Sequence, residues 1–365
     1  MYGDQALGLA KDTLEFRAFD ARRASDDSFN DFIEAEHVIN KKDERFSIDV
    51  LDDFRINDQW RVVPGLGYVQ KRIASNVYFN GEVTQNTHYL SSNMQYKPNP
   101  LFTFNVGGYL GHHDNVDEFS ESYRTTMNIH LNKAYTLRVG YAEAEWAPGM
   151  METDRDWHFY VNLNEPIDGK VSDPTFWKSI GEEGLGNECS ISKEIALLGR
   201  YDASGLNWDV RIFDEKYSDL LTTPGEFLLL NLGNDDTVDL RGADFQIRYP
   251  LSERVETQLS LYYVDLEATS SVDEKYYSRY GGSAYFGYGF DSGYNVGFSY
   301  YRNHEGVHNQ SIDRYDLNVA RRFEFADQSI LTPKISFLYR GREYRDYYRT
   351  FDAIAEVLFS LEYSH

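Results

Sequence analysis

The stretch Gly293–Arg302, GYNVGFSYYR, alternates between two kinds of side chain. Successive side chains of a β-strand point to opposite faces. One face of this stretch would carry Tyr294, Val296, Phe298 and Tyr300, and the other would carry small polar residues. The contact made by the apolar face decides the fold, because a soluble sandwich would bury that face in a core and a membrane barrel would place it in lipid.

The same alternation recurs along most of the chain. Apolar residues at every second position mark the ranges 102–106, 206–212, 255–263, 315–319 and 351–363. The strands that they predict run to about 10–15 residues, against about 5–6 in soluble sheets. A tilted strand that crosses a membrane needs about 9–11 residues, so the lengths favour a membrane-spanning sheet.

The predicted connections alternate strictly between short turns and long polar loops. Short turns fall at 57–59, 97–100, 132–134, 203–205, 251–254, 291–293 and 326–328. Longer, charged links cover 24–30, 74–87, 112–121, 146–189, 216–237, 268–277, 303–312 and 340–350. Seven turns and eight loops join sixteen strands, and outer-membrane barrels sort short periplasmic turns from long extracellular loops in this way. A soluble sandwich has no reason to sort its connections by side.

The composition agrees with a barrel. Mean hydropathy is −0.57, and no apolar run approaches the roughly 18 residues of a transmembrane helix, whereas barrel strands are half polar. The 29 Tyr and 23 Phe residues suit aromatic girdles, to which we assign Tyr276, Tyr277, Tyr280, Tyr347 and Tyr348. We expect an all-β, antiparallel transmembrane β-barrel of about 16 strands. Residues 13–365 would form this single domain, after an N-terminal periplasmic segment, residues 1–12.

Charge and chemistry exclude several classes of function. A net charge of −23 leaves no basic patch for nucleic acid. Cys189 is the single cysteine and excludes an internal disulfide. Ser190 lacks a GxSxG frame, and the two histidines of HEGVH (304–308) would need a helix to bind zinc as that motif does. We therefore predict neither an enzyme nor a cofactor.

Several stretches resemble the C-terminal half of a TonB-dependent outer-membrane receptor. They are FSIDVLDDFRINDQWRVVPGLGYVQKRI (46–73), AYTLRVGYAEAEWAPGM (134–150), SKEIALLGRYDASGLNWDVRIFDEKYSDLL (192–221) and residues 231–268, where Arg241-Gly242-Ala243 stands at the family's "rGvE" step. The resemblance implies a barrel in the outer membrane of a Gram-negative bacterium. It also implies uptake of a chelated or bulky nutrient, such as an iron–siderophore or cobalamin, with a plug domain and the TonB system as partners through the parent chain.

The sequence departs from the pattern of that family at three points. It shows no plug domain and no TonB box, and sixteen strands fall short of the family's 22. It ends Tyr363-Ser364-His365 instead of on an aromatic residue. The start, MYGDQALGLAK, lacks the features of a signal peptide. Two interpretations stay open: part of a larger plugged receptor, or a passive outer-membrane porin or export channel without energy coupling.

Candidate ligand-binding residues lie in two predicted extracellular loops. Aromatic rings and a guanidinium group can hold an aromatic, chelated ligand by stacking and hydrogen bonds. His112 and His113, beside two aspartates, are of the type that binds divalent metals, although a solvated loop is the simpler interpretation and we predict no metal site. The longest loop, 146–189, offers Trp146, Met150, Arg155, Trp157 and Trp177, and its alternative is a lid packed on itself.

Candidate pore-lining residues lie at polar positions of the predicted strands. They are Arg138, Asp209, Arg211, Glu256, Asp316 and Arg322. In a water-filled pore such charges set the ion preference, and in a plugged receptor they would pair with the plug or with each other. For an unplugged pore we expect the loop 146–189 to form the constriction and acidic residues such as Asp209 and Glu256 to favour cations.

Overall fold

The computed structural model describes the chain except for residues 1–9, 18–32, 35–37, 76–77, 164–174, 223–231, 270–277, 307–309, 342–343, 347–348, 352–354 and 365. Within these described residues the main sheet has 18 strands. They are β1 (Ala10–Arg17), β3 (Val38–Leu51), β4 (Phe54–Arg55), β5 (Trp60–Ser75), β6 (Gly81–Asn99), β7 (Phe102–His113), β8 (Glu118–His130), β9 (Tyr135–Trp146), β12 (Glu188–Tyr201), β13 (Leu206–Thr222), β14 (Gly233–Ser252), β15 (Val255–Ala268), β16 (Tyr280–Gly289), β17 (Tyr294–Gly306), β18 (Gln310–Arg321), β19 (Phe323–Glu324), β20 (Ile330–Arg340) and β23 (Ala355–Ser364).

The remaining elements are small. Strands β2 (Ile33–Glu34), β10 (Asp156–Leu163) and β11 (Thr175–Ile180) form a three-stranded sheet, and β21 (Tyr344–Asp346) pairs with β22 (Arg349–Phe351). The helix α1 covers Met150–Thr153. In the part of the chain that the structure describes, no helix is both long enough and apolar enough to span a membrane.

The main sheet is an antiparallel meander in which each long strand pairs with the next one along the chain. The two-residue strands β4 and β19 pair with the same neighbours as β3 and β18, so each continues the strand before it. Counted in this way, the 18 strands make sixteen. The prediction of an antiparallel barrel sheet of about 16 strands is confirmed. Five of the seven predicted short turns fall between strands, and the turns 97–100 and 251–254 overlap the last residues of β6 and β14.

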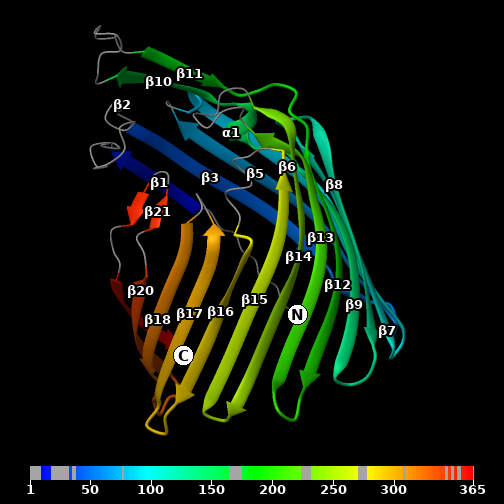
Figure 1. The fold of residues 1–365 in the computed structure, drawn as a ribbon. Coiled ribbons are helices and arrows are strands. Elements are labelled where there is room, and N and C mark those ends of the chain that lie inside the picture. The colour runs from blue at the N-terminus through cyan, green and yellow to red at the C-terminus, as the bar shows by residue number, and fades with distance from the viewer. Residues whose placement is uncertain are drawn as a thin grey trace.

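The expected closure of this barrel is not seen. The sheet curls, so that the N-terminal strands pass behind the central ones (Figure 1), but no pairing joins β1 to β23 among the described strands. Among the described strands β23 pairs only with β20 and forms an edge, where Phe359 is 77% exposed and Leu361 is 69% exposed. In lipid an unpaired edge would leave backbone groups without partners, so a membrane barrel would require a further strand at this edge.

The two faces of the sheet differ as the alternation predicts. The outer face carries exposed apolar side chains, among them Ile195, Ile212, Phe298 and Leu317. Phe298 pairs with Phe286 on β16 and with Leu317 on β18, so the apolar stripe of GYNVGFSYYR continues across three strands. A sandwich would bury such a stripe beneath a second sheet, whereas here it faces away from the protein. The inner face carries the polar residues of the same strands.

Aromatic rings flank the apolar part of the outer face. At the turn end Trp60 stacks on Tyr96, with ring centroids 4.1 Å apart. Towards the loop end Tyr300 and Tyr315 lie 4.9 Å apart, and Tyr280 stacks on the ring of His304 at 4.2 Å. Such rings match the interfacial girdles of membrane barrels. Of the five tyrosines assigned to girdles from sequence, Tyr276, Tyr277, Tyr347 and Tyr348 lie outside the described residues.

Several predicted loops are largely strand. The predicted link 74–87 is confined to the interval between Ser75 and Gly81, and the link 112–121 is confined to the interval between His113 and Glu118. These segments alternate poorly because both of their faces are polar, yet their backbone groups still pair across the sheet. The strands therefore continue past the girdle, where apolar alternation no longer marks them.

Gly199 lets an aromatic ring of the outer face lie flat on the sheet. It pairs directly with Trp208, and a Cβ atom added at Gly199 would lie 2.2 Å from both Cε2 and Nε1 of that indole. We expect Gly199→Ala to displace the ring and to lower the free energy of unfolding by about 1–3 kcal/mol.

The matched control is Gly108→Ala, since a Cβ at Gly108 meets nothing within 4 Å. We expect this control to change the stability by no more than about 0.5 kcal/mol. Urea unfolding of the three proteins in detergent, followed by tryptophan fluorescence, measures the difference. Equal loss in both variants would contradict the packing of Trp208 on Gly199.

Candidate functional site

A chain of alternating charges crosses four neighbouring strands on the inner face. The Nε atom of Arg138 on β9 lies 2.9 Å from Oε1 of Glu194 on β12. The other oxygen of Glu194 lies 3.6 Å from a guanidinium nitrogen of Arg211 on β13. Arg211 in turn donates through Nε to Asp244 on β14, at 2.7 Å. The four charges compensate each other, and together they cross-link the strands.

Five of the six predicted pore-lining residues lie on this inner face. Besides Arg138 and Arg211 they include Asp209, Glu256 and Asp316, each next to an outward apolar residue on its strand. Glu256 lies 2.6 Å from Nε of Arg248, and Asp316 accepts two hydrogen bonds from Arg314, both 2.7 Å long.

The sixth predicted residue, Arg322, lies beyond the last residue of β18. It pairs with Glu324 at 3.0 Å, at the turn end of the sheet. It therefore belongs to the rim and not to the wall. Arg322 lies an even number of residues from the inward Asp316, so alternation predicted an inward side chain, but β18 ends at Arg321.

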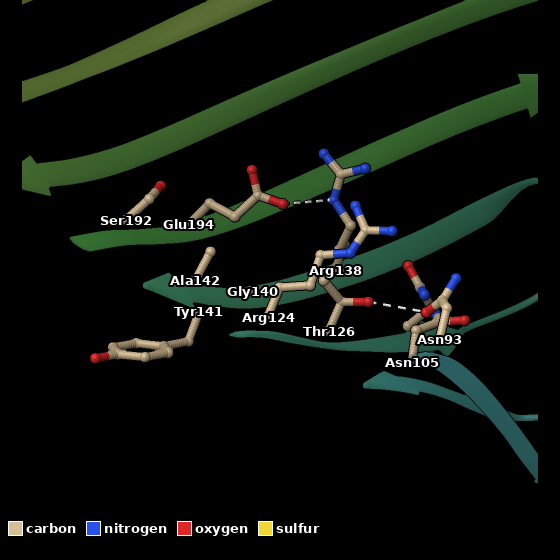
Figure 2. A pocket seen from close by; sticks show the side chains of 11 residues that line it. Asn93, Asn105, Arg124, Thr126, Arg138, Gly140, Tyr141, Ala142, Ser192 and Glu194 are labelled. Carbon is tan, nitrogen blue, oxygen red and sulfur yellow. Dashed lines mark hydrogen bonds and ion pairs between the residues drawn. The ribbon is translucent and has the colours of Figure 1, made fainter. Parts of the chain in front are cut away.

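A pocket of about 540 Å³ opens on the inner face between β6 and β12 (Figure 2). Its lining combines three asparagines, two arginines, one glutamate and a group of small residues. The polar members are Asn93, Asn105, Asn128, Thr126, Arg124, Arg138, Ser192 and Glu194. Asn105 donates to Thr126 at 3.3 Å, and Glu194 holds Arg138 as described above.

The segment between β9 and β12 folds as a lid, which comprises the described residues 147–163 and 175–187. Its centre is Arg155, which is 1% exposed. Two guanidinium nitrogens of Arg155 donate to the carbonyl oxygens of Met151 and Ile180, at 2.9 and 3.2 Å. The backbone N–H of Asp156 donates to the carbonyl oxygen of Tyr78 at 2.7 Å, which ties the lid to the link between β5 and β6.

The predicted ligand residues of this loop are placed very differently from one another. Trp146 ends β9 and is 74% exposed, whereas Met150 and Arg155 are buried inside the lid. Trp157 lies on β10 and Trp177 on β11, in paired strands of the lid, and their side chains lie outside the described part. Met150 and Arg155 therefore fit the alternative to ligand binding, in which the lid packs on itself.

The two predicted histidines cannot share a ligand. They are successive residues of β7, so their side chains lie on opposite faces of the sheet. His112 contacts the ring of Phe119, with centroids 4.9 Å apart, and His113 lies within 3.1 Å of Thr87 Oγ1 and 3.0 Å of Ser120 Oγ. Within the described residues no group of three or more His, Cys, Asp or Glu side chains is arranged to hold a metal ion.

The family of TonB-dependent receptor-like β-barrels matches residues 3–273 of this sequence. The chain belongs to that family. A comparison with curated protein sequences finds no match.

Solved structures of siderophore receptors and of an iron transporter share the fold of this chain. The siderophore receptor PirA from Acinetobacter baumannii has a TM-score of 0.60 at 14% identity, over 83% of this chain and 51% of its own. The FrpB iron transporter from Neisseria meningitidis has a TM-score of 0.62 at 10% identity, over 90% and 55%. The ferric enterobactin receptor PfeA from Pseudomonas aeruginosa, a Q482A mutant, has a TM-score of 0.59 at 15% identity, over 85% and 50%. The chain thus spans about half the length of these proteins.

Sequence reasoning missed three inner-face residues of the receptor barrel. Glu194 and Asp244 were not singled out, although Asp244 pairs with Arg211 and Glu194 contacts both Arg138 and Arg211. Arg124 was missed because β8 has no clear apolar stripe: the sequence around it, Glu121 to Thr126, is polar on both faces. Strand pairing could have identified Arg124, because it pairs with Gly107 on β7, a strand whose inner face alternation had already predicted.

Proposed function

We propose that the chain forms the barrel wall of an outer-membrane transporter that takes up a chelated or bulky nutrient, such as an iron–siderophore complex. Membership of the TonB-dependent receptor-like β-barrel family, over residues 3–273, carries this proposal. Barrels of this family lie in the outer membrane of Gram-negative bacteria. The exposed apolar stripe and the aromatic girdles fit an environment of lipid with water at both interfaces.

A plug domain and the TonB system are the partners that we propose for the complete transporter. The chain covers about half the length of the solved receptors, and the free edge at β23 calls for additional strands. Of the predicted ligand residues with described side chains, Trp146 is the most accessible at the loop end. We therefore assign Trp146 to ligand contact and keep Arg155 as a structural residue of the lid.

Uptake measurements on cells test this function. A strain without the gene, with and without a plasmid copy of the complete gene, is grown under iron limitation and given radiolabelled ferric siderophores and cobalamin. We expect one ligand to accumulate only in the complemented strain, and a protonophore to abolish that accumulation, because TonB-coupled uptake consumes the proton gradient.

The other outcomes separate the alternatives. Gene-dependent flux that the protonophore leaves intact would indicate the passive porin or channel instead. Equal accumulation in both strains, for every ligand, would overturn transport of this class of nutrient.

A further inference from the structure

Arg124 differs from four other arginines of the inner face. Arg138, Arg211, Arg248 and Arg314 each lie within 3.0 Å of a carboxylate oxygen. In the part of the chain that the structure describes, the exposed guanidinium of Arg124 has neither an ion-pair partner nor a hydrogen-bond partner. An unpaired cation is notable in a chain with a net charge of −23.

Small residues of neighbouring strands create the hollow in which Arg124 lies. It pairs with Gly107 on β7 and with Ala142 on β9, and Gly140 and Ser192 complete the floor. A Cβ atom at Gly107 would lie 3.2 Å from Cγ of Arg124, closer than ordinary contact. The glycine therefore leaves room for the arginine stem to lie across β7, and larger residues here would fill the pocket.

The charge of the pocket is positive. Arg124 and Arg138 contribute two positive charges, and Glu194 is the one carboxylate in the lining. Figure 2 shows Glu194 directed at Arg138, while no dashed line reaches Arg124, which lines the same pocket. The amide groups of Asn93 and Asn128 lie along the same lining and can donate further hydrogen bonds.

We propose that this pocket binds an oxyanion, of which a carboxylate is the best-fitting kind. A guanidinium is charged at every physiological pH and presents a planar pair of N–H donors that matches the two oxygens of a carboxylate. The asparagine amides supply further donors without adding charge, and the net positive charge of the lining favours an oxyanion over a cation. This binding does not require that the chain transport a nutrient. The preference for an anion contrasts with the preference for cations that acidic residues such as Asp209 and Glu256 predict from the sequence.

Two sources can present this oxyanion: a free small anion, or an aspartate or glutamate side chain of a protein segment that occupies the interior. Both would neutralise Arg124 in the same way. Malonate and inorganic phosphate serve as probes for a free anion. Membranes washed free of small molecules reveal whether a protein side chain still protects Arg124.

Arginine-selective labelling with phenylglyoxal, read by mass spectrometry, tests the site in the full chain in detergent. We expect Arg124 to react at least fivefold faster than the paired Arg138 and Arg211, and malonate to slow the reaction at Arg124 alone. Arg124→Gln should lower malonate affinity, measured by calorimetry, by about tenfold to a hundredfold, the contribution of hydrogen bonds to a charged group. Arg61→Gln is the control, because Arg61 pairs with Asp53 at the turn end.

A gain-of-function variant distinguishes the site from a merely exposed arginine. Glu194→Gln releases Arg138 while Arg211 keeps its bond to Asp244, so malonate should bind several times more tightly. Circular dichroism confirms that each variant keeps its strand content. Unprotected labelling of Arg124 at saturating malonate and phosphate, or an affinity that neither Arg124→Gln nor Glu194→Gln changes, would overturn the proposal.

The same labelling in outer membranes from the source cells separates the two sources. If Arg124 stays protected after the membranes are washed free of small molecules, a protein carboxylate occupies the pocket. If washing exposes Arg124 and added malonate protects it again, the natural occupant is a free anion. An Arg124 that labels rapidly before and after washing, with or without malonate, would count against both.

Discussion

Phe298→Arg should lower the stability of the folded chain in a lipid bilayer by about 2–4 kcal/mol, the cost of an arginine on the lipid face near the bilayer midplane. Phe298 is 45% exposed on the outer face and is paired with Phe286 and Leu317. It lies between the ring of Tyr294 at the turn end and that of Tyr300 towards the loop end. A guanidinium at this position would be held within hydrocarbon.

The matched control places the same arginine on the other face. Asn318 is on the strand next to Phe298, and its side chain accepts a hydrogen bond from Ser336 on the inner face, at 2.7 Å. We expect Asn318→Arg to cost no more than about 1 kcal/mol, since the lost hydrogen bond is of that size and the new charge meets water. Urea unfolding in vesicles compares the variants, and equal losses would show that the outer face does not contact lipid.

Arg155→Met should open the lid while leaving the sheet intact. The two carbonyl oxygens that Arg155 holds, those of Met151 and Ile180, would lose their donors, and each buried acceptor without a partner costs about 1–3 kcal/mol. Hydrogen exchange measures this opening. The amide of Asp156 donates to the carbonyl oxygen of Tyr78, and the amide of Gly181 donates to that of Arg155. Both amides should exchange at least tenfold faster in the variant than in the unmodified protein.

Amides within the paired segment of β12 and β13 serve as the internal reference, and their exchange should not change. Arg155→Lys is the conservative variant: it keeps the charge, but a single ammonium cannot copy the planar, two-pronged donation. We expect its exchange rates to lie between those of the other two proteins. Unaltered exchange at Gly181 in Arg155→Met would show that the lid is anchored by other contacts.

The sequence predicts this fold well wherever one face of a strand is apolar and the other is polar. Phe298 and Leu317 alternate with polar residues in this way, and short turns such as 291–293 bound their strands as expected. The prediction fails where both faces meet water. There the strand β6 begins at Gly81, within a segment predicted as loop, because backbone pairing needs no apolar stripe.

The candidate site was less predictable because its properties depend on neighbours in space. Alternation places Arg138 and Arg211 on the inner face, but it does not reveal that Glu194 lies between them. Likewise, the composition of the longest loop suggests exposed ligand contacts, whereas Arg155 is enclosed by backbone carbonyl groups from both sides of the lid. His112 and His113 were treated as one pair, although strand geometry alone assigns them to opposite faces.

The free edge at β23 has a consequence for the order of assembly. A strand that offers a lipid-facing stripe of Val357, Phe359, Leu361 and Tyr363 together with unpaired backbone groups is a template for any other strand that reaches it. Hydrocarbon penalises each unpaired group by several kcal/mol, so insertion into the bilayer and recruitment of the neighbouring strand must be coupled events. In a complete barrel a neighbouring strand would cover this edge, and two isolated chains in one bilayer would offer each other matching edges.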